Sequence, residues 1–149
     1  MQVPILVLLF AGIPESIALT TLAFVLAKVD LEWKKICLIG FILAICAYFL
    51  RLLPITFGVH TIVSIGLLII LINAFTEADL VVSIVASFIG FLCLIFLETF
   101  VYFVVLHIFN LSMEHIEKNE TLRVLFSVPT IILIFLISYI INAYKKRKM

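Results

Sequence analysis

The stretch that decides the fold runs from Leu80 to Phe109 and reads LVVSIVASFIGFLCLIFLETFVYFVVLHIF. Glu98 is the one residue of this stretch that is an Asp, Glu, Lys or Arg, and a histidine lies near its end. A helix of about 30 residues would be about 45 Å long, whereas the hydrocarbon core of a bilayer is about 30 Å thick. The stretch therefore predicts a transmembrane helix whose end projects into the interface near Asn110 to His115.

Four other apolar runs accompany this one, each close to the length that a membrane span needs. Hydrophobic residues make up 66% of the chain and charged residues only 13%. In lipid the backbone groups of a segment must be bonded within that segment, so all of the runs are predicted to be helices. We predict an all-α, polytopic transmembrane helix bundle with about five spans, forming a single domain over residues 1–149. The other four runs are about Val3 to Val29, Trp33 to Leu53, Phe57 to Phe75 and Leu122 to Tyr144.

Prolines interrupt the first and the last run. Proline lacks a backbone donor and clashes with the preceding turn, so the first helix is predicted to be broken or kinked at Pro14. A kinked single span and two half-helices around an unwound point are both open, and the second resembles the discontinuous helices of transporters. In the last run Pro129 either kinks the helix or marks its start, with Ser127 as the cap.

Basic residues predict the orientation of the bundle. The densest cluster is Lys145-Lys146-Arg147-Lys148. In a five-span bundle it shares one side with Lys28, Lys34 and Lys35 of the first loop. Because loops rich in Lys and Arg stay on the cytoplasmic side, we predict a multi-pass protein of the cytoplasmic membrane. Its C-terminus would lie in the cytoplasm and its N-terminus outside.

Composition and motifs exclude several classes of protein. With a net charge of +1 and its dense basic cluster confined to the C-terminal end, the chain is not expected to bind nucleic acid. Cys37, Cys46 and Cys93 are widely spaced within apolar runs and fit neither a disulfide framework nor a metal-binding pair. No hydrolase, metalloprotease or nucleotide-binding motif is present. We therefore expect no enzymatic activity, no cofactor and no metal.

Ionisable residues inside or at the edges of the apolar runs are the candidates for a functional site, because a charge in hydrocarbon costs about 2.5 kcal/mol or more. They are Glu15, Arg51, His60 and Glu98, with Tyr102 one helical turn after Glu98 on the same face. We predict that these five residues form a ligand-binding site. Two roles are open for Arg51, either extension into the lipid headgroups or a buried ion pair. Because the negative charges of Glu15 and Glu98 need a compensating positive charge in lipid, we predict that Arg51 pairs with at least one of these carboxylates.

Small residues spaced four apart predict close contacts between helices. Gly40 with Ala44, in the second run, and Ala86 with Gly90, in the fourth, would let backbones approach closely. We predict a homo-oligomer such as a dimer, or a stable complex with a membrane partner protein. The face from Ala86 to Gly90 is expected to favour self-association.

Two motifs resemble a known family. Ile13-Pro14-Glu15-Ser16 and Arg51-Leu52-Leu53-Pro54-Ile55-Thr56-Phe57-Gly58-Val59-His60-Thr61 look like the N-terminal membrane sensor region of clostridial GHKL-type sensor histidine kinases. The resemblance covers residues 1 to about 75, and the remainder only in general pattern. Such kinases continue into a phosphoacceptor helix and an ATP-binding domain, neither of which follows the fifth run. The resemblance therefore implies a stand-alone sensor or a sensor fragment.

These features favour a signalling module of the membrane. It would bind a peptide, a small ligand or a proton at the intramembrane polar site and signal through a partner chain. A small membrane transporter or channel component is the alternative. A channel needs a continuous polar path, which the few polar residues on each predicted helix disfavour.

Overall fold

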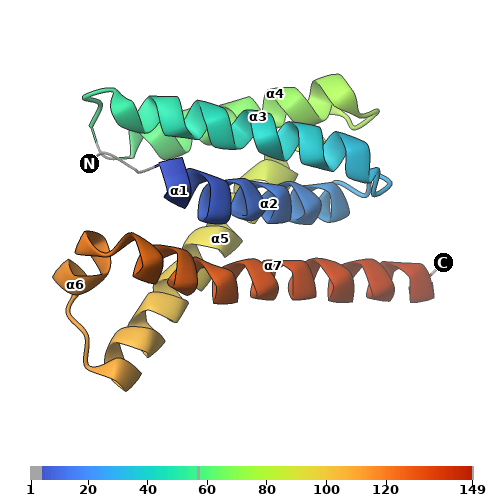
Figure 1. Cartoon of the computed structure of the whole chain (residues 1–149). Coiled ribbons are helices and arrows are strands. Elements are labelled where there is room, and N and C mark those ends of the chain that lie inside the picture. The colour runs from blue at the N-terminus through green and yellow to red at the C-terminus, as the bar shows by residue number, and fades with distance from the viewer. Residues whose placement is uncertain (1–4, 57, 149) are drawn as a thin grey trace.

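The computed structural model describes residues 5–56 and 58–148, and the elements within these ranges are helices, with no strand. The predicted run limits Val3 and Phe57 lie outside the described residues. Figure 1 shows the all-α helical bundle that the apolar runs predict. Its elements are α1 (Ile5–Val7), the π-helix η1 (Leu8–Gly12), α2 (Ile13–Leu26), α3 (Trp33–Leu52), α4 (Val59–Phe75), α5 (Leu80–Phe109), α6 (Met113–Lys118) and α7 (Glu120–Lys148).

The first run is one uninterrupted helix from α1 through η1 into α2, so the alternative of two half-helices is wrong. Gly12 and Ile13 keep right-handed helical backbone angles. Where η1 meets α2, the Ile13 amide donates to the carbonyl of Leu8, five residues back. This wider turn lies directly before Pro14, and it accommodates the missing donor of the proline within a single span.

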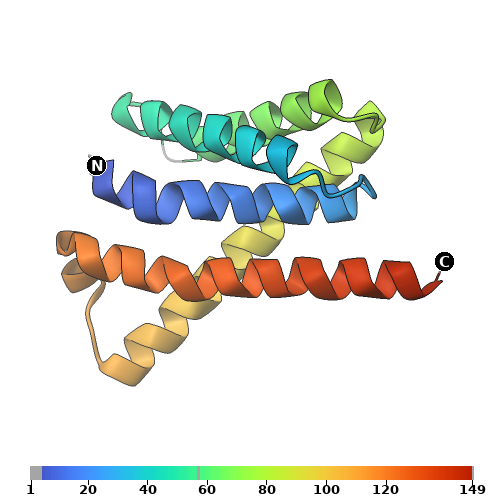
Figure 2. The same cartoon turned by 45° about the vertical axis from the view of Figure 1, so that its right-hand side comes forward.

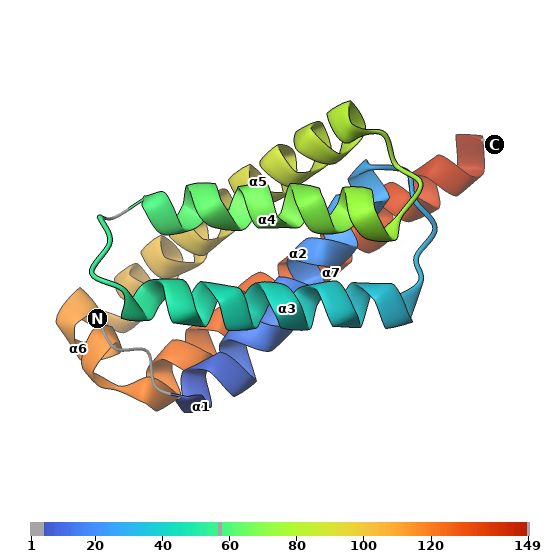
Figure 3. The same ribbon diagram turned by 90° about the horizontal axis from the view of Figure 1, so that it is seen from above.

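Four helices are long and apolar enough to cross a membrane, namely Ile5–Leu26, α3, α5 and α7. The remaining helix, α4, has 17 residues, at the short end of the range that spans a bilayer. Figure 3 shows α4 running beside α3 from one end of the bundle to the other. The chain therefore runs along the bundle five times.

Large apolar side chains cover the outside of the bundle. Phe96 of α5 exposes 71% of its surface, Ile62 of α4 exposes 70% and Tyr139 of α7 exposes 72%. A soluble protein rarely exposes broad apolar surfaces of this kind, whereas lipid tails cover them. Together with the four long apolar helices, these surfaces show a multi-pass membrane protein in a lipid bilayer.

The helix α2 is the centre of the bundle, where it packs against α3, α5 and α7. A Cβ atom added to Gly40 of α3 would lie 2.9 Å from the Cα of Ile17 in α2, closer than such atoms pack in proteins. On α5, a Cβ added to Gly90 would lie 3.4 Å from a methyl carbon of Leu19, also in α2. The second and fourth runs both pack on the first, with a close backbone approach at Gly40 and an ordinary van der Waals contact at Gly90.

This packing overturns the expectation that the Ala86 to Gly90 face drives self-association. Ala86 is 2% exposed and Gly90 is buried, and Gly90 faces Leu19 and Ala23 of α2 in the same chain. A second copy cannot reach this face without displacing α2. Association with another chain must use the lipid-facing surfaces instead.

The long helix α5 ends where its sequence predicts, beyond the neighbouring helices. Asn110 follows it with a left-handed backbone (φ 49°), the conformation that commonly terminates a helix. Figure 2 shows the second half of α5 diverging from α7 before α6 leads the chain back.

The helix α7 begins at Glu120 and continues through Pro129. Pro129 therefore does not mark the start of the helix. The Ser127 hydroxyl donates to the carbonyl of Val124 at 2.7 Å, inside the helix. The predicted capping role of Ser127 is therefore wrong.

The apolar core gathers at the end of the bundle that holds the C-terminus. It is built from the second halves of α2, α4 and α7 and the first half of α3, which lie toward the same end in Figure 1, and from Phe91 and Leu94 in the middle of α5. We refer to this region as the packed half. Its fully buried apolar residues are Ala18, Leu22, Ala23, Phe24, Ile36, Ile39, Leu68, Ile72 and Ile134.

Candidate functional site

A cavity of about 350 Å³ lies in the other half of the bundle, which we refer to as the hollow half. Glu15, Arg51, His60, Glu98 and Tyr102 all line it. The structure thus brings together, from four helices, the five residues that the sequence singles out. A volume of this size is at the small end of the range of about 300–1,000 Å³ for small-molecule sites.

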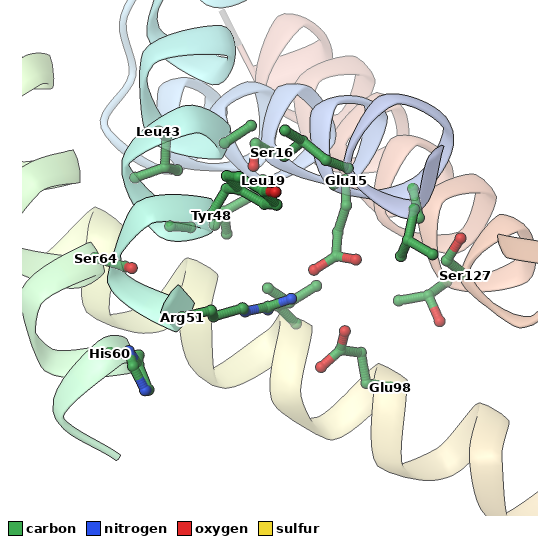
Figure 4. Close-up of a pocket in the computed structure, with 18 of the residues that line it drawn as sticks. Glu15, Ser16, Leu19, Leu43, Tyr48, Arg51, His60, Ser64, Glu98 and Ser127 are labelled. Atoms are coloured by element: carbon green, nitrogen blue, oxygen red, sulfur yellow. The ribbon is translucent and has the colours of Figure 1, made fainter. Parts of the chain in front are cut away.

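Glu15 of α2 and Glu98 of α5 form the acidic part of the cavity. Their carboxyl groups point toward each other in Figure 4. They are close enough to share a side-chain hydrogen bond when one of them holds a proton. Two ionised carboxylates at such a separation repel strongly in a low dielectric. The pair therefore needs a shared proton or a positively charged partner.

Arg51, near the end of α3, points its guanidinium group into the same cavity (Figure 4). Its charge acts on both carboxyl groups. Yet among the described residues one ion pair is closer than 4.0 Å, that of Lys35 with Glu32 at 3.1 Å, and Arg51 takes no part in it. The predicted direct pairing of Arg51 with Glu15 or Glu98 is therefore wrong. The two carboxyl groups point toward each other, and the Arg51 guanidinium group points toward them from more than 4.0 Å away.

His60 and Tyr102 are positioned by their local structure. Gly58 has a left-handed backbone (φ 99°), which lets α4 begin at Val59 and places His60 in its first turn. Within the described part of the chain, His60 Nδ1 is buried without a hydrogen-bond partner. The Tyr102 ring meets Phe126 of α7 edge-on, with 6.5 Å between ring centroids, so Tyr102 lies where α5 meets α7.

The helix α7 adds polar residues that the hydropathy pattern does not single out. Arg123, Ser127 and Thr130 line the cavity. Hydropathy alone assigns Arg123 to the membrane surface, because it stands at the start of an apolar run. The signal that points inward is the spacing of four and then three residues, which places all three on one face of a helix. Tyr48 of α3 and Ser64 of α4 are further polar lining residues.

The charges of the site are two carboxyl and two guanidinium groups. Outside the first loop and the basic tail, the Lys and Arg residues are Arg51, Lys118 and Arg123, and Arg51 and Arg123 line the cavity. In the described ranges no group of three or more His, Cys, Asp and Glu residues is placed to hold a metal ion. The lining of the cavity therefore combines acidic, basic and hydroxyl groups.

Comparisons with protein-family models, with curated proteins and with solved structures give no match to this chain. The resemblance to the membrane region of sensor histidine kinases therefore stays a prediction from its two motifs.

Proposed function

We propose that this protein is a membrane signalling module that binds a small charged ligand in the hollow half and signals through a partner chain. The observation that carries the proposal is the convergence of Glu15, Glu98 and Arg51 on one cavity without direct ion pairing to the arginine. Burial of such charges is costly unless they are paired and hydrogen-bonded. A ligand that supplies the missing partners would recover that cost on binding.

The packed half supports binding rather than conduction. A channel requires a polar path across the membrane, but beyond the cavity the bundle is filled by fully buried residues such as Leu22, Ile39 and Ile72. A transporter remains the alternative, since alternating access would open this half in a second conformation. Ligand-dependent flux into proteoliposomes that is lost in Glu98→Gln would favour transport.

Signal transmission is proposed to run through α2. This helix carries Glu15 in the cavity and contributes Leu22 and Phe24 to the packed half. It also packs against α3, α5 and α7. A ligand that binds one arrangement of these helices more tightly than another shifts the population toward that arrangement. The lipid-facing surfaces then present a different face to a partner chain.

The proposal places the C-terminus in the cytoplasm, with the cavity in the outer half of the membrane. The basic residues 145–148 and the lysines of the first loop lie at the same end of the bundle, as this orientation requires (Figure 1). Reporter fusions at the C-terminus and within the loop from Thr76 to Asp79 should both report the cytoplasm. A reporter signal from outside the cell at the C-terminus would contradict the orientation.

The signalling role is tested by photo-crosslinking in living cells. A photoreactive residue replaces Phe96 or Tyr139, whose side chains face lipid. We expect a defined adduct, with a second copy or with a partner protein, whose yield changes in Arg51→Gln and Glu15→Gln. The control is Glu32→Gln, which removes an exposed ion pair at the opposite end of α3. Equal yields in all four proteins, or no adduct from either position, would overturn the proposal.

A further inference from the structure

The cavity has two poles of opposite charge. Its acidic pole consists of the facing carboxyl groups of Glu15 and Glu98. Its basic pole is the Arg51 guanidinium group, which enters from the end of α3. Since no carboxylate oxygen of a described residue lies within 4.0 Å of Arg51, the two poles do not neutralise each other by contact. The space between the poles is the space that a ligand would occupy.

The acidic pole fits a primary ammonium group. An ammonium nitrogen carries three hydrogen-bond donors and can donate to both carboxylates at once, replacing the proton that they would otherwise share. A metal ion fits poorly, because no third acidic, histidine or cysteine ligand joins the pair among the described residues. A quaternary ammonium group has no donor, and its methyl groups would hold the carboxylates apart.

The basic pole fits an oxyanion. A guanidinium group offers paired N–H donors whose geometry matches a carboxylate or a phosphate. Tyr48, Thr61 and Ser64 line the same cavity and carry hydroxyl groups that can donate to further oxygens. The His60 side chain also lines the cavity, and its Nδ1 is buried without a hydrogen-bond partner among the described residues. An anion held here would supply Arg51 with the partner that the fold does not.

We propose that the ligand is a small zwitterion, with a primary ammonium group held between Glu15 and Glu98 and an oxyanion held by Arg51. This inference rests on the proposed function only in using the same cavity. Two sources supply such chemistry, a free aminoalkyl phosphate and the phosphoethanolamine headgroup of a membrane lipid. Both present the same pair of charges, so the experiment has one arm for each source.

The first arm measures binding of soluble probes by calorimetry. The full chain is placed in nanodiscs made only of phosphatidylcholine, which has no primary amine. Phosphoethanolamine should bind more than about tenfold more tightly than phosphocholine, ethanolamine or glycerol 1-phosphate, because each of these lacks a donor or a charge that the site requires. Equal affinity for phosphoethanolamine and glycerol 1-phosphate would overturn the ammonium assignment. If soluble phosphoethanolamine does not bind in this arm and phosphatidylethanolamine is not retained in the second arm, the inference as a whole is overturned.

The second arm asks whether a lipid is the source. Nanodiscs that contain phosphatidylethanolamine are compared with the phosphatidylcholine discs by native mass spectrometry. Retention of phosphatidylethanolamine on the chain, together with loss of phosphoethanolamine binding, would identify the lipid headgroup. Unchanged binding of soluble phosphoethanolamine in both kinds of disc would identify a free zwitterion.

Matched variants assign the poles. Glu15→Gln keeps a side chain that can hydrogen-bond to Glu98 but removes a charge, and Arg51→Gln removes the basic pole. Each should weaken phosphoethanolamine binding by more than about tenfold, with an unchanged thermal unfolding midpoint as the check on folding. Glu32→Gln should bind like the unmodified protein. Equal binding by all three variants would overturn the assignment of the poles.

Failure of this inference can be told apart from failure of the proposed function. If no zwitterion binds but the crosslinking yields still depend on Arg51 and Glu15, the site signals in response to a ligand of another class. If phosphoethanolamine binds but the crosslinking yields do not change in the variants, the ligand class stands and the signalling role fails.

Discussion

The two halves of this bundle are built from the same helices but differ in what fills them. In the packed half, Leu22 and Ile39 are both 0% exposed and belong to the apolar core cluster. In the hollow half, Glu15 and Arg51 stand on the same two helices, α2 and α3, and border a cavity of about 350 Å³. Under the proposed function, the packed half supplies stability and the hollow half supplies binding. Mutations at the two ends should therefore act on different properties.

The largest effect on stability is expected in the packed half. Leu22→Ala should lower the free energy of unfolding by about 2–5 kcal/mol, because it removes a fully buried side chain and leaves a void. Unfolding in mixed detergent micelles measures the change. A loss below about 1 kcal/mol would mean that the packed half relaxes freely around the void, and the contrast between the halves would weaken.

An intermediate effect is expected where α3 touches α2. Gly40→Ala should cost about 1–3 kcal/mol, because the added Cβ would lie 2.9 Å from the Ile17 Cα and force the helices apart. The matched control is Gly66→Ala on α4, where an added Cβ meets nothing within 4 Å. The control should be neutral or stabilising, by up to about 1 kcal/mol from helix propensity. Equal losses for the two variants would contradict the close contact.

The smallest effect on stability is expected in the hollow half. Glu15→Gln removes a charge from a low-dielectric site and keeps an amide that can donate to Glu98. The free energy of unfolding should therefore stay within about 1 kcal/mol of the original value or rise, as replacement of buried ionic groups often does. The same unfolding assay applies. A loss above about 2 kcal/mol would show that this carboxyl group holds the fold together, against its assignment to binding.

The sequence was sufficient for the spans and for five of the residues that line the cavity, and physical reasons explain both. Apolar runs report helices directly, because lipid leaves no other backbone conformation for a single segment. Glu98 and Glu15 had to face the interior of the bundle, since ionisable residues do not face lipid. Because successive helices run in opposite directions, Arg51 at the end of one helix and His60 at the start of the next lie at the same end of the bundle as Glu15.

The details that the sequence could not supply depend on contacts between helices. The π-helical turn before Pro14 changes the rotation of the helix ahead of Glu15, and no local propensity signals it. The contact of Gly40 with Ile17 makes α2 central, although the small-residue pattern equally permits packing between copies. The place of Arg123 in the cavity follows from the rotation of α7, so hydropathy leaves it on the surface.

A crystal structure grown from a lipid mesophase tests the central claim most directly, because it shows what occupies the hollow half. The account predicts an open cavity containing bound density that reaches Glu15 and Glu98 at one end and Arg51 at the other. A collapsed cavity without such density, in which the Arg51 guanidinium group is hydrogen-bonded directly to either carboxylate, would contradict it.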